Sequence, residues 1–185
     1  ANNDGDRGSK SKINNDGVVS TDVLMEQEIM LNHVLIEEYC NEKKEITLPL
    51  VLEDEVLQEA FRKQLVHEMS HENLQLWNEI RKLIALKDVQ AKRQCAIKIL
   101  RDYMDTDSKY QMNFNQSTIF AFRDAVLDEN CELLMDNSIL HRLMSETEFL
   151  MLDSFKRFKE NPILKQLLHN KKQQYRKSNG DVLSV

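Results

Sequence analysis

The sequence predicts an all-α protein, and two observations carry this prediction. From about residue 53 to residue 168 the apolar residues recur at intervals of three and four, which is the spacing of one helix face. Residues that interrupt helices are scarce there: the chain has two prolines, and its four glycines (Gly5, Gly8, Gly17 and Gly180) lie close to its two ends. The pattern indicates long helices joined by polar turns.

The position of the glycines also excludes several classes of function. Residues 18–179 contain no glycine. Loops that cradle phosphate groups and turns that bind dinucleotides need glycine, because only glycine gives positive φ and close backbone approach without a steric penalty. A GTPase, a kinase or a Rossmann enzyme is therefore excluded, and we expect no cofactor.

The first fifty residues divide into a tail and an extension. Residues 1–17 are rich in Asn, Asp, Gly, Ser and Lys, with Ile13 as the single large apolar residue, and they are expected to be disordered. Helix-capping residue types at 20–22 predict a helix over 21–40. Its apolar residues include Val23, Leu24, Leu31, Val34 and Leu35. We assign residues 18–51 to a helical extension.

The segment Leu48-Pro49-Leu50 closes that extension. A residue that precedes proline is disfavoured in helical backbone, so this segment is expected to be extended.

The main domain is assigned to residues 52–170, where apolar stripes mark successive helices. The stripes are Val56, Leu57, Ala60, Phe61 and Leu65; Leu76, Trp77, Ile80, Leu83 and Ile84; Ala96, Ile99, Leu100 and Tyr103; and Ile139, Leu143, Met144 and Leu150. Ser70 is expected to cap the second of these helices. Residues 105–115 are polar and predict a loop, and residues 118–127 predict a further helix.

Asn161-Pro162 supplies the cap and first turn of a final helix that passes through Leu164, Leu167 and Leu168. Residues 171–185 are expected to form a basic tail. Its cluster Lys171, Lys172, Arg176 and Lys177 is interpreted as a solvated helix end, with contact to anionic lipid or nucleic acid as the alternative.

Charge and cysteine content restrict the surroundings and the partners. The net charge of −6 argues against a general nucleic-acid binder, which needs a basic face to neutralise phosphates. No apolar run approaches the ~18 residues of a membrane span. Cys40, Cys95 and Cys131 are odd in number and far apart, which indicates free thiols in a reducing compartment inside the cell.

A metalloprotease pattern occurs at His67-Glu68-Met69-Ser70-His71, which matches H-E-x-x-H. In that motif two histidines on one helix face bind zinc, and the glutamate acts as the general base. No third ligand follows at a suitable distance. If Ser70 begins a new helix, His67 and His71 lie on different elements. We therefore interpret the match as coincidental and expect no metal site.

Three other elements resemble the regulator of G-protein signalling (RGS) family. Residues 60–65 and 68–77 resemble its Phe-x-x-Phe-Leu and Ser-x-Glu-Asn-Leu-x-Phe-Trp patterns. Residues 152–158 resemble its Asp-Ser-Tyr-x-Arg-Phe element. Met112-Asn113-Phe114 lies where the family places an asparagine in an interhelical loop. The resemblance covers roughly residues 52–170, and the elements agree in order and spacing.

The resemblance implies a helical bundle of about nine helices in two subdomains, with the 21–40 helix added before it. Large apolar residues of the matching elements are expected in the core: Phe61, Leu65, Leu74, Trp77, Phe155 and Phe158. The matching polar residues, with Phe149, are expected to contact a Gα subunit. This set is Glu68, Glu72, Asn73, Asn113, Phe149, Asp153, Ser154 and Arg157.

Individual roles follow from the same resemblance. Asn73 is expected to be exposed at the start of its helix, where its amide orients a glutamine of the Gα switch. Asn113 would support a neighbouring switch segment. Asp153 would accept backbone N–H groups, with Arg157 orienting it through an ion pair. Met69, His71 and Phe149 depart from the family pattern, which leaves the choice of Gα subunit open.

The implied function is acceleration of GTP hydrolysis by Gα, without an active site in this chain. A non-catalytic RGS-homology scaffold or effector module is the alternative. We expect a cytoplasmic monomer that is recruited to the inner face of the plasma membrane, where its partner would be Gα in the GTP-bound or transition-state form.

Overall fold

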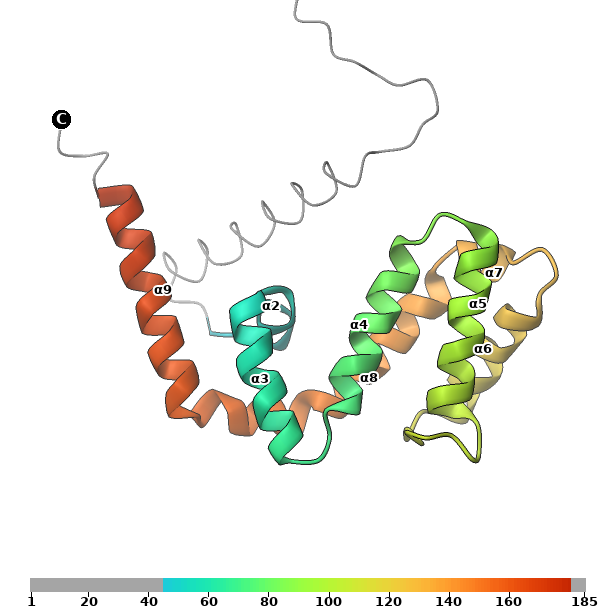
Figure 1. The fold of residues 1–185 in the computed structure, drawn as a ribbon, viewed down its shortest axis with the longest axis horizontal. Helices are drawn as coiled ribbons and strands as arrows, with labels where there is room; N and C mark the ends of the chain where they lie inside the picture. Colours follow the sequence, from blue (N-terminus) through green and yellow to red (C-terminus); the bar gives the residue numbers. More distant parts are fainter. Residues whose placement is uncertain (1–44, 181–185) are drawn as a thin grey trace, which may run out of the picture.

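The computed structural model describes residues 45–180, with side chains to residue 177, and this part of the chain is helical without strands (Figure 1). The elements are α2 (Leu48–Glu53), α3 (Glu55–His67), α4 (Glu72–Ala85), α5 (Val89–Ile99), the π-helical segment η1 (Leu100–Met104), α6 (Gln116–Leu127), α7 (Glu132–Met135), α8 (Ser138–Glu160) and α9 (Pro162–Gly180). The predicted all-α class is confirmed. The disordered tail predicted for 1–17 and the helix predicted for 21–40 lie outside the described residues.

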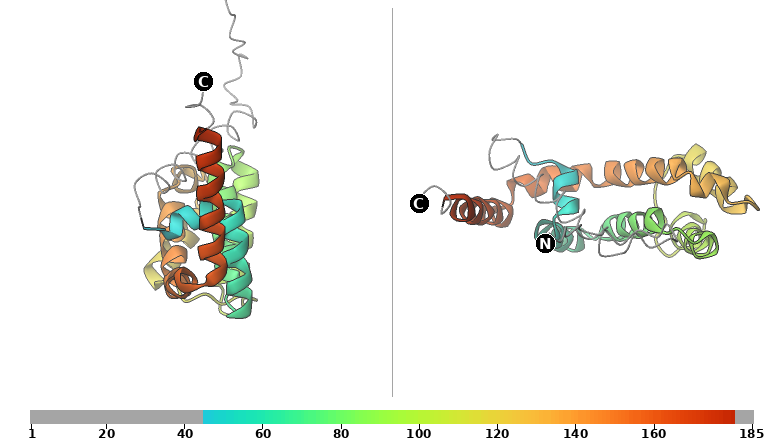
Figure 2. Two further views of the ribbon diagram at one scale, coloured as in Figure 1. Left: turned by 90° about the vertical axis from the view of Figure 1, so that its left-hand side faces the viewer. Right: turned by 90° about the horizontal axis from the view of Figure 1, so that it is seen from above.

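The described bundle has two hydrophobic cores, one in each half. Two cores fit the two subdomains that the resemblance implies. One core joins α2 and α3 to α9, and the other joins α5, η1, α6 and α7. Helices α4 and α8 contribute to both cores and lie side by side through the middle of the molecule (Figures 1 and 2). The six apolar residues expected in the core from the resemblance are all buried. Fully burying a side chain of this size contributes ~1.5–3 kcal/mol.

Helix α2 corrects the prediction of an extended Leu48-Pro49-Leu50. Pro49 occupies the first turn, where a backbone N–H has no partner within the helix and its absence costs nothing. The Thr47 hydroxyl oxygen accepts the Leu50 amide at 3.5 Å and caps the helix. Leu48, Leu50 and Ile46 are buried in the first core, so packing onto that core favours helix here.

The α3–α4 turn corrects the predicted role of Ser70. Met69 adopts a left-handed backbone with φ of 57°, and the Ser70 N–H donates to the Leu65 carbonyl at 2.9 Å. This geometry directs the Ser70 carbonyl, and not its hydroxyl, toward the start of α4. His71 is the capping position and makes no side-chain cap, while the Ser70 hydroxyl is buried without a hydrogen bond.

The C-terminal helices are longer than predicted. Helix α8 runs without a break for 23 residues, and the Asn161 Oδ1 accepts the Ile163 amide at 2.9 Å, which confirms the predicted cap of α9. Helix α9 continues to Gly180, so residues 171–180 are helical and not a tail. Lys171 is tied to the bundle by an ion pair with Asp54, whose facing oxygen is 2.7 Å away.

Within the described residues, Cys95 is exposed and Cys131 is buried. No helix in this part of the chain has the length and apolarity to cross a bilayer.

Candidate functional site

Helix α8 fixes the positions of three other segments through polar contacts along its length. Glu146 holds the loop between η1 and α6, and Glu148 accepts the Trp77 indole N–H of α4 at 2.9 Å. Ser154, further along, holds the α3–α4 turn. Glu146 and Ser154 are about two helical turns apart, ~12 Å along the axis. The α3–α4 turn and the η1–α6 loop therefore lie at one edge of the molecule (the lower edge in Figure 1).

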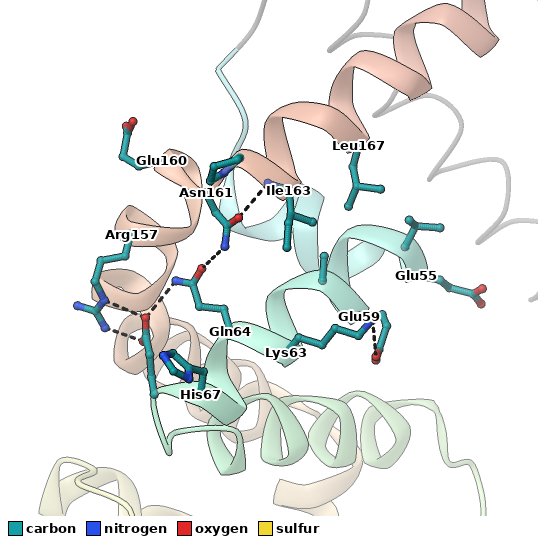
Figure 3. Close-up of a pocket in the computed structure, with 14 residues that line it drawn as sticks. Glu55, Glu59, Lys63, Gln64, His67, Arg157, Glu160, Asn161, Ile163 and Leu167 are labelled. Atoms are coloured by element: carbon teal, nitrogen blue, oxygen red, sulfur yellow. Dashed lines mark hydrogen bonds and ion pairs between the residues drawn. The ribbon is translucent and has the colours of Figure 1, made fainter.

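Glu68 is the centre of a hydrogen-bond network at the α3–α4 turn. Arg157 donates to both of its oxygens, at 2.9 and 2.6 Å, and the Ser154 hydroxyl donates to it at 2.5 Å. Gln64 donates to the same carboxylate at 3.1 Å and to the Ser154 carbonyl at 3.0 Å. Figure 3 shows Gln64 between Arg157 and Asn161, whose amide donates to it at 3.1 Å.

The network has an electrostatic consequence. The hydrogen bonds from Arg157, helped by those from Ser154 and Gln64, outweigh partial burial and lower the pKa of Glu68 to about 2. The carboxylate is ionised at neutral pH and charge-assisted on both oxygens, which is the strong form of this contact. The turn is thus fixed against α8 before any partner arrives.

Asn73 follows the α3–α4 connection in the chain and lies in the first helical turn of α4. It is 9% exposed, which corrects the expectation of an exposed side chain. Its Nδ2 donates to the Ser70 carbonyl at 3.0 Å, and no donor among the described residues reaches its Oδ1. The neighbouring Glu72 is half-buried, with a carboxylate oxygen 3.8 Å from the His71 Nδ1.

Asn113 lies on the other loop, and it is exposed as expected. The loop is fixed just after it: Glu146 accepts the Asn115 amide at 3.1 Å and the Thr118 hydroxyl. Asn113, Glu146 and Phe149 line a shallow hollow of about 240 Å³. The hollow brings two predicted site residues together from η1–α6 and α8.

Phe149 and Asp153 are one helical turn apart on the solvent face of α8, and both are exposed. The expected ion pair between Asp153 and Arg157 is contradicted, since Asp153 pairs with Lys156 at 2.9 Å and Arg157 pairs with Glu68. The Lys156 hydrogen bond lowers the pKa of Asp153. Ser154 faces inward and is 6% exposed.

Sequence reasoning missed the residues that hold the site together. Gln64, Glu146 and Glu148 make the supporting contacts described above, yet in the sequence each is one more polar residue on a helix. Only their partners far away in the chain distinguish them: Ser154 and Asn161 for Gln64, Asn115 for Glu146 and Trp77 for Glu148.

The prediction that the two histidines of the H-E-x-x-H match lie on different elements is confirmed: His67 ends α3 and His71 precedes α4. Its glutamate, Glu68, is engaged by Arg157. Residues 45–177 contain no group of three or more metal-ligating side chains.

The edge combines the exposed apolar side chain of Phe149 with exposed polar side chains on a helical frame, a composition typical of protein-binding surfaces. The family model of the Regulator of G protein signaling domain matches residues 47–167, which is most of the chain. The chain belongs to the regulator of G-protein signalling family. The match begins before the predicted boundary at residue 52, in agreement with the packing of α2 into the core.

Comparison with curated proteins finds no match. Family membership implies a role in regulating G-protein signalling through a Gα subunit, and a domain of this kind acts on Gα and not through an active site of its own.

Proposed function

We propose that this protein accelerates GTP hydrolysis by a Gα subunit, binding the Gα switch regions with the edge formed by the α3–α4 turn, the η1–α6 loop and α8. The observation that carries the proposal is that an asparagine lies at each connection, Asn73 just after the α3–α4 turn and Asn113 on the η1–α6 loop, with both connections tied to α8. A surface used only for docking has no need of both Asn73 and Asn113.

An accelerating protein does not need to supply catalytic groups of its own, because Gα already carries them. Gα carries its own arginine and a glutamine that orients water, and it hydrolyses GTP at ~10⁻² per second. Acceleration follows if the switch segments are held in their transition-state arrangement, because this ordering is then removed from the barrier. Each tenfold gain needs ~1.4 kcal/mol, so a few well-placed hydrogen bonds suffice.

Each site residue has a role in this proposal. The free Oδ1 of Asn73 would accept from the switch glutamine, while its Nδ2 stays bonded to Ser70. Asn113 would support the adjacent switch segment from the opposite loop. Asp153 would exchange its bond from Lys156 for bonds from switch backbone N–H groups. The exposed Phe149 would pack against the switch between Asn113 and Asp153.

Glu68, Ser154 and Arg157 contribute mainly by fixing the α3–α4 turn, since their polar atoms bond one another. Arg157 is exposed enough to contact Gα as well, and Glu72 completes the rim of the candidate site.

The test is single-turnover GTP hydrolysis by a panel of Gα subunits, measured alongside binding to the GDP–aluminium fluoride state. Acceleration of at least one subunit, with preferential binding to that state, supports the proposal. Binding to Gα without acceleration supports a scaffold or effector instead. In either case we place the protein in the cytoplasm, acting as a monomer at the inner face of the plasma membrane, where Gα resides.

A further inference from the structure

A large groove opens between α3 and α9, and the Glu68 network forms one of its walls through Gln64, Glu68, Arg157 and Asn161. It holds about 970 Å³, and its apolar lining comes from both helices: Val56, Ala60, Pro162, Ile163 and Leu167. Figure 3 shows Ile163 and Leu167 directed from α9 toward α3. The groove is separate from the hollow between Asn113 and Phe149.

Two large side chains of this groove are unusually exposed. Val56 is 52% exposed and Ile163 is 58% exposed, although they line one concave surface. Apolar side chains gathered in a concavity mark a binding surface more strongly than the same residues scattered singly. The α3 side of the groove extends over 13 residues, ~20 Å, which suits the apolar face of a helix.

The chain itself offers a candidate occupant in the segment 21–40, which the sequence predicts to be helical. Residues 1–44 precede the described part, which begins where Glu45 pairs with Lys159 at 2.5 Å. Lys159 is adjacent to Glu160, a residue of the groove wall. The predicted helix 21–40 is joined to Glu45 by four residues, which reach at most ~14 Å.

The apolar residues of 21–40 match the apolar lining of the groove. Leu24, Leu31 and Leu35 recur at intervals of seven and four, which gives an apolar stripe. The segment carries five carboxylates and neither Lys nor Arg. On the rim, Lys63 is 71% exposed and is paired only loosely, at 4.0 Å, with Glu59.

Four carboxylates line the groove, and three of them (Glu59, Glu68 and Glu160) already have cations, which weakens their repulsion of an acidic segment. Glu59 is paired with Arg62 at 2.6 Å, and Glu160 is paired with Lys165 at 3.4 Å.

We propose that residues 21–40 dock as a helix in the α3–α9 groove of the same chain, with Leu24, Leu31 and Leu35 covering Val56 and Ile163. The short connection makes this association intramolecular and gives a high effective concentration. The proposal does not depend on the activity toward Gα.

Hydrogen exchange of the full chain tests the proposal, because an isolated helix of this length is marginal in water and protects its amides poorly. In the wild-type protein the amides of 21–40 should exchange roughly tenfold or more slowly than in an unstructured peptide. Ile163→Glu, from the groove, and the double change Leu31→Glu with Leu35→Glu, from the segment, should each remove this protection. The matched control is Ile97→Glu, at an exposed position of α5 in the other half, which should leave protection unchanged.

Three results would overturn the proposal. The amides of 21–40 would exchange freely in the wild-type protein, or their protection would survive Ile163→Glu while circular dichroism shows the bundle folded. Alternatively, protection would fall on dilution with a matching change in sedimentation, which would assign the groove to a second copy of the chain.

Discussion

The α3–α4 turn and the η1–α6 loop meet at one edge of the molecule but are built differently. The first is fixed within itself and to α8 by the Glu68 network, and its asparagine is nearly buried. The second is fixed by Glu146 where α6 begins and by the buried Met112 and Phe114 on either side of Asn113, but the Asn113 side chain itself is exposed. Among the described residues, the Asn73 side chain is held by an internal hydrogen bond to the Ser70 carbonyl, and the Asn113 side chain has none.

The difference between the two asparagines indicates which side chain must have a fixed orientation before Gα binds. A side chain that must stabilise a transition state acts best when its orientation is fixed before binding, since no ordering cost then falls on the reaction. A side chain that supports a partner segment tolerates more freedom. We therefore expect changes in the α3–α4 turn to have larger effects than changes in the η1–α6 loop.

The largest effect is expected for Asn73→Ala. It removes the Oδ1 proposed to orient the switch glutamine, so acceleration in single-turnover GTP hydrolysis should fall by ~100-fold or more. The lost bond to the Ser70 carbonyl should lower the free energy of unfolding by only ~1 kcal/mol. Gln75→Ala, at an exposed position of the same helix, is the control. Unchanged acceleration by Asn73→Ala would remove this residue from the mechanism.

Glu68→Gln should come next, because it loosens the turn without touching Asn73. Acceleration should fall roughly tenfold, and the free energy of unfolding at neutral pH should fall by ~1 kcal/mol after allowance for solvent screening. The pH dependence has a defined sign. The folded-state pKa of Glu68 is about 2, below the ordinary 4.5, so its contribution is present above pH 4.5 and is lost as pH falls toward 2.

Urea unfolding of the wild-type and Glu68→Gln proteins at several pH values checks this sign. The stability gap should close at low pH. Glu59→Gln, which breaks an exposed pair with Arg62, should have a much smaller effect at every pH. A gap that is independent of pH would show that the network does not depend on the Glu68 charge.

Phe149→Ala should weaken binding to the GDP–aluminium fluoride state of Gα by about tenfold, because it removes an apolar contact between the two loops. The melting temperature should stay unchanged, since Phe149 is 72% exposed. The matched control is Phe120→Ala on α6, which is also exposed. Equal losses for both variants would argue against a localised interface.

Asn113→Ala should have the smallest effect, a reduction in acceleration of about threefold to tenfold. Its loop keeps its anchor, because Glu146 holds Asn115 and not Asn113. The comparison of Asn113→Ala with Asn73→Ala in one assay tests whether the held asparagine side chain contributes more than the exposed one. Equal losses would contradict the distinction drawn here.

Much of the fold was predictable, because helix periodicity and capping are local properties. The stripe through Phe61 and Leu65 and the cap at Asn161 appear in the structure as expected. The failures are places where distant packing overrides local preference. Leu48-Pro49 is helical because its neighbours are buried, and Ser70 does not cap α4 because Met69 turns the chain the other way.

The sequence by itself determined the helical class and the family, because these depend on residue type and spacing. Tertiary structure alone decided the partners and burial of the candidate site residues: Arg157 binds Glu68 and not Asp153, and Asn73 is nearly buried instead of exposed. The physical reason is that an ion pair or a burial depends on how α8 crosses the α3–α4 turn. That crossing is set by two cores whose residues are far apart in the chain.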